Sequence, residues 1–109
     1  MAVYEGKHGH DVTRNGIALD LAPSLKAWNH SPTGFSWGYG GSGPAQLALA
    51  LLLDATGDAE LSVRLHQTFK WAFVAGWPTG WRITSERIRD WVDERRPADE
   101  EATDAQDPV

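Results

Sequence analysis

Apolar residues fill almost every position between Pro44 and Ala55, whereas apolar and polar residues are mixed on both sides of this run. Leucines and alanines leave no polar face there, so the segment predicts a helix that other elements must cover on nearly every side. Pro44 is favourable in the first turn of a helix, and Gly57 is favourable just after the last turn. The pattern therefore predicts a central core helix from Pro44 to about Ala55.

Two further helices are predicted after this run. The first extends from about Ala59 to Val74, with Asp58 as its N-cap, and it ends before Gly76. Its apolar positions recur at helical spacing: Leu61, Leu65, Phe69, Ala72 and Phe73. The next helix has Thr84 as its N-cap. Its apolar face consists of Ile88, Trp91 and Val92.

An antiparallel hairpin is predicted around Asn15-Gly16, because this dipeptide favours the two positive φ angles of a type I′ turn. The flanking segments 12–14 and 17–19 are the predicted hairpin strands. Segments 4–8 and 81–84 are candidates for one or two more short strands. The sheet is therefore expected to be small and antiparallel.

Residues 22–43 contain Pro23, Pro32 and several glycines, which predicts a mostly irregular segment. A loop this long within a compact domain is more often functional or well packed than idle. The elements together predict an α+β fold, in which the small antiparallel sheet packs on three helices. Residues 1–96 are expected to form one globular domain, and residues 97–109 an acidic, disordered tail.

Composition narrows the classes of function. The chain has 109 residues, six tryptophans, no cysteine and a net charge of −5. The lack of cysteine excludes disulfides, thiolate metal ligands and a cysteine nucleophile. The negative charge argues against direct binding to a nucleic-acid backbone, which needs clustered lysine and arginine. No apolar run approaches the roughly 20 residues that span a bilayer, and no signal core is visible, so a cytoplasmic protein without membrane contact is expected.

Gly38, Gly40 and Gly43 have the spacing G-x-G-x-x-G just before the predicted core helix. In a dinucleotide-binding fold these glycines belong to a βαβ unit. Here a second helix follows the first, so no parallel strand returns beside it. No lysine follows the last glycine, which excludes a Walker loop as well. The glycines therefore indicate an entry into a helix more strongly than a nucleotide site.

A looser ligand site at the same helix start stays open. Backbone amides of Ser42, Gly43, Ala45 and Gln46 could bind a phosphate or carboxylate at the positive end of the helix. The alternative is that this helix start is only capped. Ser42 also approaches a nucleophile-elbow pattern, but Pro44 replaces its last glycine and the chain is too short for the corresponding fold. Ser42 is therefore interpreted as a capping or turn residue.

His8 and His10 alternate on one side of a predicted strand, where two imidazoles could hold a metal ion. No third ligand is identifiable by spacing, and ordinary surface histidines are the alternative. No cofactor is predicted.

The tryptophans are too numerous for all of them to be central, so most are expected to pack around the core helix. The aromatic residues of the irregular segments are the better candidates for an exposed recognition surface, because aromatic side chains anchor protein interfaces. This predicted interaction surface consists of Trp28, Phe35, Trp37, Tyr39, Trp77 and Trp81.

The run Trp37-Gly-Tyr-Gly-Gly-Ser-Gly-Pro-Ala-Gln46, together with flanking motifs over about residues 29–92, resembles a small domain-of-unknown-function family of bacteria, phages and mobile elements. The resemblance brings no established activity. It implies an accessory protein that acts by binding other proteins, for example an inhibitor of defence systems such as CRISPR effectors.

The sequence thus favours a non-enzymatic protein-binding module with a protein partner. The alternative is a domain that binds a phosphate-bearing small molecule, or acts on it, at the Ser42–Gln46 helix start. The question of enzymatic activity stays open and leans toward none. A homodimer is possible, since a second copy could cover the apolar helix.

Overall fold

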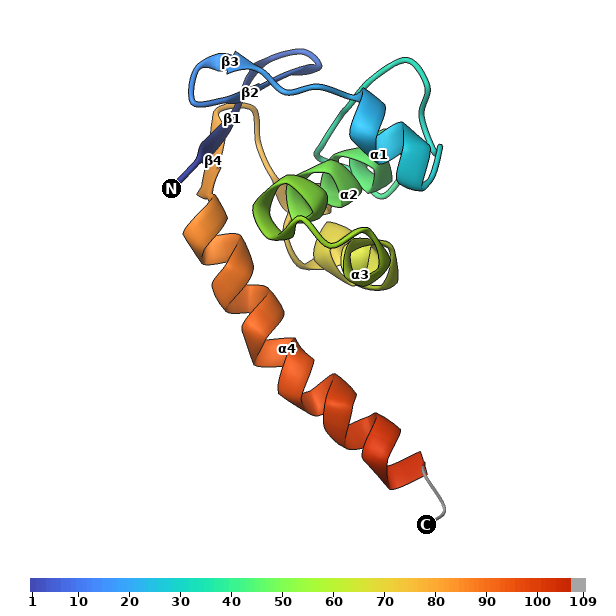
Figure 1. Cartoon of the computed structure of the whole chain (residues 1–109). Helices are drawn as coiled ribbons and strands as arrows, with labels where there is room; N and C mark the ends of the chain where they lie inside the picture. The colour runs from blue at the N-terminus through green and yellow to red at the C-terminus, as the bar shows by residue number, and fades with distance from the viewer. Residues whose placement is uncertain (107–109) are drawn as a thin grey trace.

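A computed structural model describes residues 1–95 in full and the backbone of the last helix as far as Gln106. The predicted acidic tail, 97–109, lies outside the residues described in full, and the predicted domain range stays a prediction. The elements in chain order are β1 (Val3–His8), β2 (Asp11–Arg14), β3 (Ile17–Ala18), α1 (Ala22–Ala27), α2 (Ser42–Thr56), α3 (Ala59–Ala72), the 3₁₀ turn η1 (Val74–Gly76), β4 (Trp81–Thr84) and α4 (Ser85–Gln106) (Figure 1).

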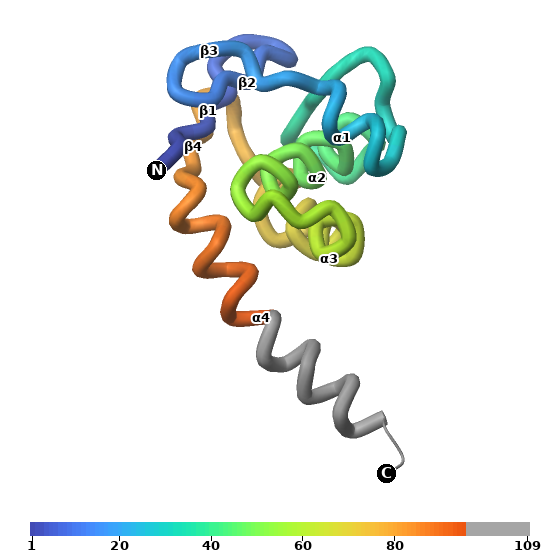
Figure 2. The backbone as a smooth tube through the Cα atoms, in the orientation of Figure 1, coloured from blue at the N-terminus to red at the C-terminus, as the bar shows by residue number. Residues whose placement is uncertain are grey.

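The sheet has four antiparallel strands in the order β3-β2-β1-β4. Arg14 pairs with Ile17 across the predicted turn, in which Asn15 and Gly16 have φ angles of 52° and 81°. Both additional strands are present, because β1 pairs with β2 on one side and with β4 on the other. Figure 2 shows how the chain returns from the helices to place β4 beside β1. The α+β prediction is confirmed.

Helix α2 is the centre of the core, as its pattern predicts. Residues 43–52 are all buried, and α2 packs against α1, α3, α4 and η1. In Figure 1 it lies between the sheet and α1 above and α3 below. A single chain therefore covers this helix, and its burial requires no second copy.

Local signals at the other helix ends also agree with the sequence. The side chain of Asp58 accepts a hydrogen bond from the Leu61 amide at 3.0 Å, as an N-cap does. The Thr84 hydroxyl accepts one from the Arg87 amide at 3.1 Å. Helix α3 ends at Ala72, slightly earlier than predicted, and the chain continues into η1.

The prediction of a mostly irregular segment over residues 22–43 is wrong at its beginning, where α1 forms. Asp20 Oδ1 accepts a hydrogen bond from the Ala22 amide at 2.9 Å. Pro23 stands in the first turn, where its missing N–H costs no hydrogen bond. Pro23 therefore favours a short helix here, although a proline in a sequence also indicates a loop.

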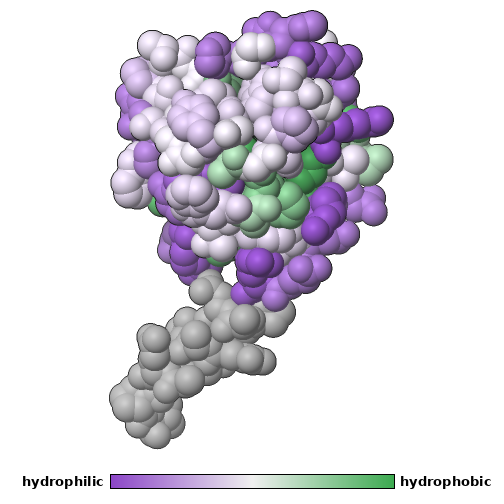
Figure 3. Space-filling model, turned by 180° about the vertical axis from the view of Figure 1, so that it is seen from behind, coloured by the Kyte–Doolittle hydropathy of each residue, from purple (hydrophilic) through white to green (hydrophobic). Residues whose placement is uncertain are grey.

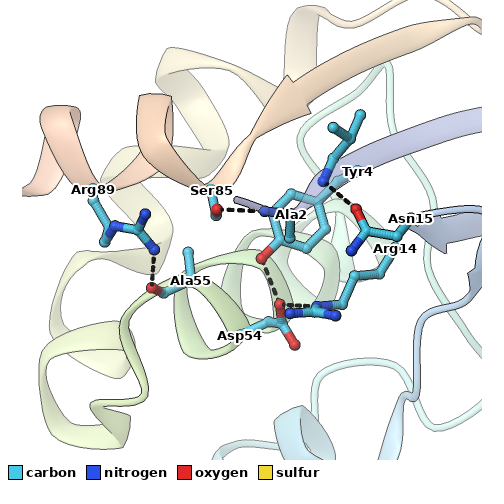
Figure 4. A network of polar contacts seen from close by, with 9 residues as sticks. Ala2, Tyr4, Arg14, Asn15, Asp54, Ala55, Ser85 and Arg89 are labelled. Carbon is cyan, nitrogen blue, oxygen red and sulfur yellow. Dashed lines mark hydrogen bonds and ion pairs between the residues drawn. The ribbon is translucent and has the colours of Figure 1, made fainter.

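One network of polar contacts joins the sheet to α2 (Figure 4). Tyr4 of β1 is fully buried, and its hydroxyl donates to Asp54 Oδ2 at 2.5 Å. Arg14 of β2 donates from Nε to the same oxygen at 2.7 Å. Burial, followed by the Asp54 carboxylate, raises the pKa of Tyr4 well above its ordinary value. Next to this network, Arg89 of α4 donates a hydrogen bond to the Ala55 carbonyl of α2 at 3.3 Å.

We expect Tyr4→Phe to lower the free energy of unfolding by about 1.5–3 kcal/mol at neutral pH, because it removes a buried hydrogen bond to a carboxylate. Wild-type stability should also fall as the pH rises above about 10, since the unfolded tyrosine then loses its proton while buried Tyr4 keeps it. Tyr4→Phe should weaken this decline. Urea denaturation of the wild type and of Tyr4→Phe, at neutral pH and above about pH 10, measures the two effects.

Tyr39→Phe is the matched control for this substitution, because Tyr39 is 54% exposed. A Tyr4→Phe protein as stable as the control at neutral pH would contradict the assigned role of the hydroxyl.

Candidate functional site

Three large aromatic side chains are exposed near the junction of the loop 28–41 with helix α3. The exposed fractions are 51% for Trp28, 54% for Tyr39 and 65% for Trp71. Trp28 lies 5.8 Å from the His66 ring of α3, and Trp71 of α3 lies over Gly40 of the loop. We call these three exposed residues the aromatic seam. They belong to two segments that are distant in sequence and packed together in space.

Gln46 fixes the loop that carries Trp28. Its side chain is completely buried at the start of α2, and its Oε1 accepts hydrogen bonds from the His30 and Ser31 amides at 2.7 and 3.0 Å. Its Nε2 donates to the Ser24 hydroxyl at 3.0 Å and to the Trp28 carbonyl at 3.1 Å. These four bonds use the full capacity of a side-chain amide. The Gln46 side chain therefore has a structural role, whereas the predicted ligand contact through the Gln46 backbone amide stays a prediction.

The backbone of the glycine segment allows the Trp71 ring to approach closely. A Cβ atom on Gly40 would lie 2.1 Å from the ring of Trp71, so any larger residue would displace that ring. Lys70 is buried beneath the seam, where Nζ donates to the Gly40 carbonyl at 3.4 Å and lies 4.5 Å from the Trp71 ring centre. Trp71 is thus held between a glycine and a cation while most of its surface stays exposed.

The predicted anion site at the start of α2 stays a prediction, and its residues lie in different surroundings. Gly43 is buried against the Ser36 side chain, and the Ala45 amide already donates to the Gly41 carbonyl at 3.1 Å. Ser42 is exposed. A hollow of about 350 Å³ lies beside this helix end. It includes Ser42 and Gly43 in its lining, whereas Ala45 and Gln46 are not among the residues that line it.

The predicted interaction surface divides into exposed and buried residues. Trp28 and Tyr39 are exposed, whereas Phe35 and Trp81 are each only 5% exposed and belong to the core. These two are not surface residues, because Phe35 packs inward from the loop and Trp81 packs inward from β4. Trp77 stacks on Trp81 with ring centres 4.2 Å apart, and Trp37 and Trp77 are partly buried.

Trp71 is the exposed aromatic residue that sequence reasoning missed. It lies in a predicted helix, which suggested packing, yet it is two residues beyond Phe69 and so is off the apolar stripe of α3. The position of Trp71 relative to this apolar stripe was the signal available in the sequence.

Seen from behind, hydrophobic side chains gather in the middle of the surface, surrounded by hydrophilic ones (Figure 3).

The predicted metal pair is not formed on one strand. β1 ends at His8, the chain turns at Gly9, and His10 lies in that turn with Nδ1 2.9 Å from the Phe35 carbonyl. Both histidines are exposed. Within residues 1–95, no group of three or more histidine, aspartate and glutamate side chains is arranged to hold a metal ion.

Another pair of histidines lies inside the junction of loop and α3. The Nε2 atoms of His30 and His66 are 2.9 Å apart, and Trp28 stacks on His30 with ring centres 5.2 Å apart and planes within 5°. His66 is 2% exposed. Burial lowers the pKa of both imidazoles, and the Lys70 charge lowers both further. No spacing rule connects these histidines, because 36 residues separate them.

Another hollow lies between β3, α1 and the C-terminal half of α2. It has a volume of about 660 Å³, and the Arg14–Asp54 ion pair is part of its lining. Its mostly apolar walls include Ile17, Leu19, Pro23, Ala50 and Leu53.

The chain belongs to DUF6166, a family of unknown function whose model matches residues 4–94. A search of curated proteins found no significant match, and neither did a search of solved structures. Among the helices of the described residues, none combines the length and apolar character that crossing a membrane requires.

We expect Gln46→Leu to lower the free energy of unfolding by about 2 kcal/mol or more, because it leaves partly buried backbone groups of the loop without their partners. The amides of His30 and Ser31 should also lose protection from hydrogen exchange. Urea denaturation and hydrogen exchange measure these effects. Gln67→Leu on the exposed face of α3 is the control. Equal stability of the two variants would show that Gln46 does not hold the loop.

Proposed function

We propose that this protein is a non-enzymatic protein-binding module that contacts its partner through the aromatic seam. The observation that supports this proposal is the exposure of Trp28, Tyr39 and Trp71 on a surface whose backbone is fixed from inside. Tryptophan and tyrosine are the residues most enriched at the energetic centres of protein interfaces. Exposure of three such residues near one junction is costly unless a partner covers them.

The fixed geometry of the seam favours binding further. Gln46 orders the loop of Trp28, and Gly40 with Lys70 orders Trp71. The Tyr39 hydroxyl bonds to the Ser36 hydroxyl at 2.9 Å. Side chains that are ordered before binding lose less conformational entropy when a partner arrives. The seam is thus suited to a partner with a complementary apolar surface.

The biological setting of this proposal comes from the resemblance of the glycine-rich motif. An accessory or inhibitor protein of a phage or mobile element, such as an anti-defence protein, would act by occupying a surface on another protein. The net charge of −5 would steer it toward a basic partner.

A small-molecule-binding function is the second candidate, and the hollow of about 660 Å³ favours it at a place other than the glycine-rich loop. Its volume and apolar walls with a polar edge are typical of ligand pockets. Thermal-shift screening with small amphipathic compounds tests this function. Stabilisation that is lost in Leu53→Asp would support it, and no stabilisation at millimolar concentrations would contradict it.

We expect Trp28→Ala and Trp71→Ala each to weaken partner binding by about tenfold or more, since truncation of a central interface tryptophan commonly costs about 2 kcal/mol. Affinity capture with quantitative mass spectrometry identifies proteins that the wild type retains. Calorimetry with the purified partner then gives the affinities.

Ile17→Ala is the matched control for these variants, because Ile17 is 75% exposed but lies on β3. Thermal unfolding verifies that each variant is folded. Equal affinities for the wild type, the control and both tryptophan variants would remove the basis of the proposal.

A further inference from the structure

The partly buried imidazole of His30 and the buried imidazole of His66 have definite proton positions. The Val63 carbonyl, which can only accept, lies 2.5 Å from His66 Nδ1, so that nitrogen carries a hydrogen. Neutral His66 then has a bare Nε2. Because a hydrogen must lie between two nitrogens 2.9 Å apart, His30 donates from Nε2 to it. His30 Nδ1 is left as the unprotonated nitrogen of the pair.

Addition of protons disrupts this arrangement. A proton on His66 Nε2 faces the Nε2–H of His30, so His30 must transfer its own hydrogen to Nδ1 before the contact can persist. A second proton makes both facing nitrogens donors, and they must separate. No carboxylate has an assigned contact with either ring within residues 1–95, and the charged group that acts on both is the cationic Lys70. Once both imidazoles are charged, His66 therefore needs water as its partner in place of His30, and His30 moves away to admit it.

Resting on the proposed function, we propose that the His30–His66 pair is a proton-operated clasp that holds Trp28 in its partner-binding orientation. At neutral pH the clasp is closed, His30 is fixed, and Trp28 stacks on it with ring centres 5.2 Å apart. In acid the clasp opens and Trp28 loses its support. The partner is bound at neutral pH and released on acidification.

The movement is confined to side chains, because the loop backbone has a separate anchor. Gln46 bonds to the backbone of Trp28, His30 and Ser31. A primary amide does not titrate, so this anchor is the same at every pH. Ser24 of α1, which accepts a hydrogen bond from Gln46, is likewise uncharged. Acid therefore releases two rings without unfolding the loop.

The lowered pKa values fix the pH range of the transition. Because the fold favours the neutral imidazoles, the clasp is closed above the ordinary histidine pKa of about 6.5 and opens as the pH falls through the lower pKa values of the folded state. The transition is thus expected on the acidic side of about 6.5.

Side-chain NMR on the full, isotope-labelled chain tests the clasp without a partner. At about pH 7.5, long-range nitrogen–proton correlations should show His66 protonated at Nδ1 and His30 at Nε2. Titration to about pH 5 should shift the Trp28 indole resonance with the same midpoint as the two rings, while Trp91 in the core stays unchanged. A Trp28 resonance that does not follow the ring midpoint would overturn the proposal.

His30→Phe is the decisive variant, because phenylalanine can stack on Trp28 but cannot titrate. It should abolish the pH-dependent shift of Trp28, whereas His8→Gln, which removes an exposed histidine at the end of β1, should preserve it. An unaltered shift in His30→Phe would contradict the clasp. If His30→Phe does not fold, the ring-proton assignment in the wild type decides alone.

Binding measurements separate this inference from the proposed function. With the partner identified by capture, affinity should fall by about tenfold or more between about pH 7.5 and about pH 5 for the wild type, and less for His30→Phe. Binding that depends on Trp28 and Trp71 but not on pH would overturn the clasp alone. A Trp28 shift that follows the histidines, with binding insensitive to both tryptophan substitutions, would overturn the seam and retain the clasp as a conformational device.

Discussion

The burial of helix α2 is the constraint on which the rest of the structure depends. Its apolar side chains point in every direction, and α1, α3, α4 and η1 pack around it. Two polar side chains interrupt the apolar run, and each organises one part of the molecule. Asp54 accepts hydrogen bonds from the Tyr4 hydroxyl and the Arg14 guanidinium of the sheet. Gln46 accepts hydrogen bonds from backbone amides of the loop before α2.

Gln46 explains how a loop of irregular structure becomes a defined surface. A buried amide without partners would cost more than the core gains from it, so the loop and Gln46 require one another. The loop in turn presents Trp28 and Tyr39 at fixed positions. The surface proposed for binding is therefore a consequence of core packing, because the group that orders the loop is also part of the central helix.

Sequence reasoning succeeded where the determining signal was local. The Asn15-Gly16 turn, the Asp58 and Thr84 caps and the apolar period of the helices each depend on a few neighbouring residues, and the structure contains all of them. The direction of an aromatic ring in an irregular segment is not local. Phe35 and Tyr39 are four residues apart in the same loop, yet the first is buried and the second is exposed. The His30–His66 contact could not be predicted from the sequence for the same reason, because it joins residues that are distant in the chain.

The glycine-rich segment illustrates how one pattern acquires a different meaning in three dimensions. G-x-G-x-x-G suggests close approach of backbone to a phosphate, and close approach is indeed what the glycines provide. The approaching groups, however, belong to the protein itself: the Trp71 ring at Gly40 and the Ser36 side chain at Gly43. Because both contacts fix the loop against α2 and α3, the same glycines that suggest a ligand site instead give the aromatic seam its rigidity. Glycine spacing alone therefore indicates that something must pack closely against the backbone, and only the tertiary structure identifies the packing group.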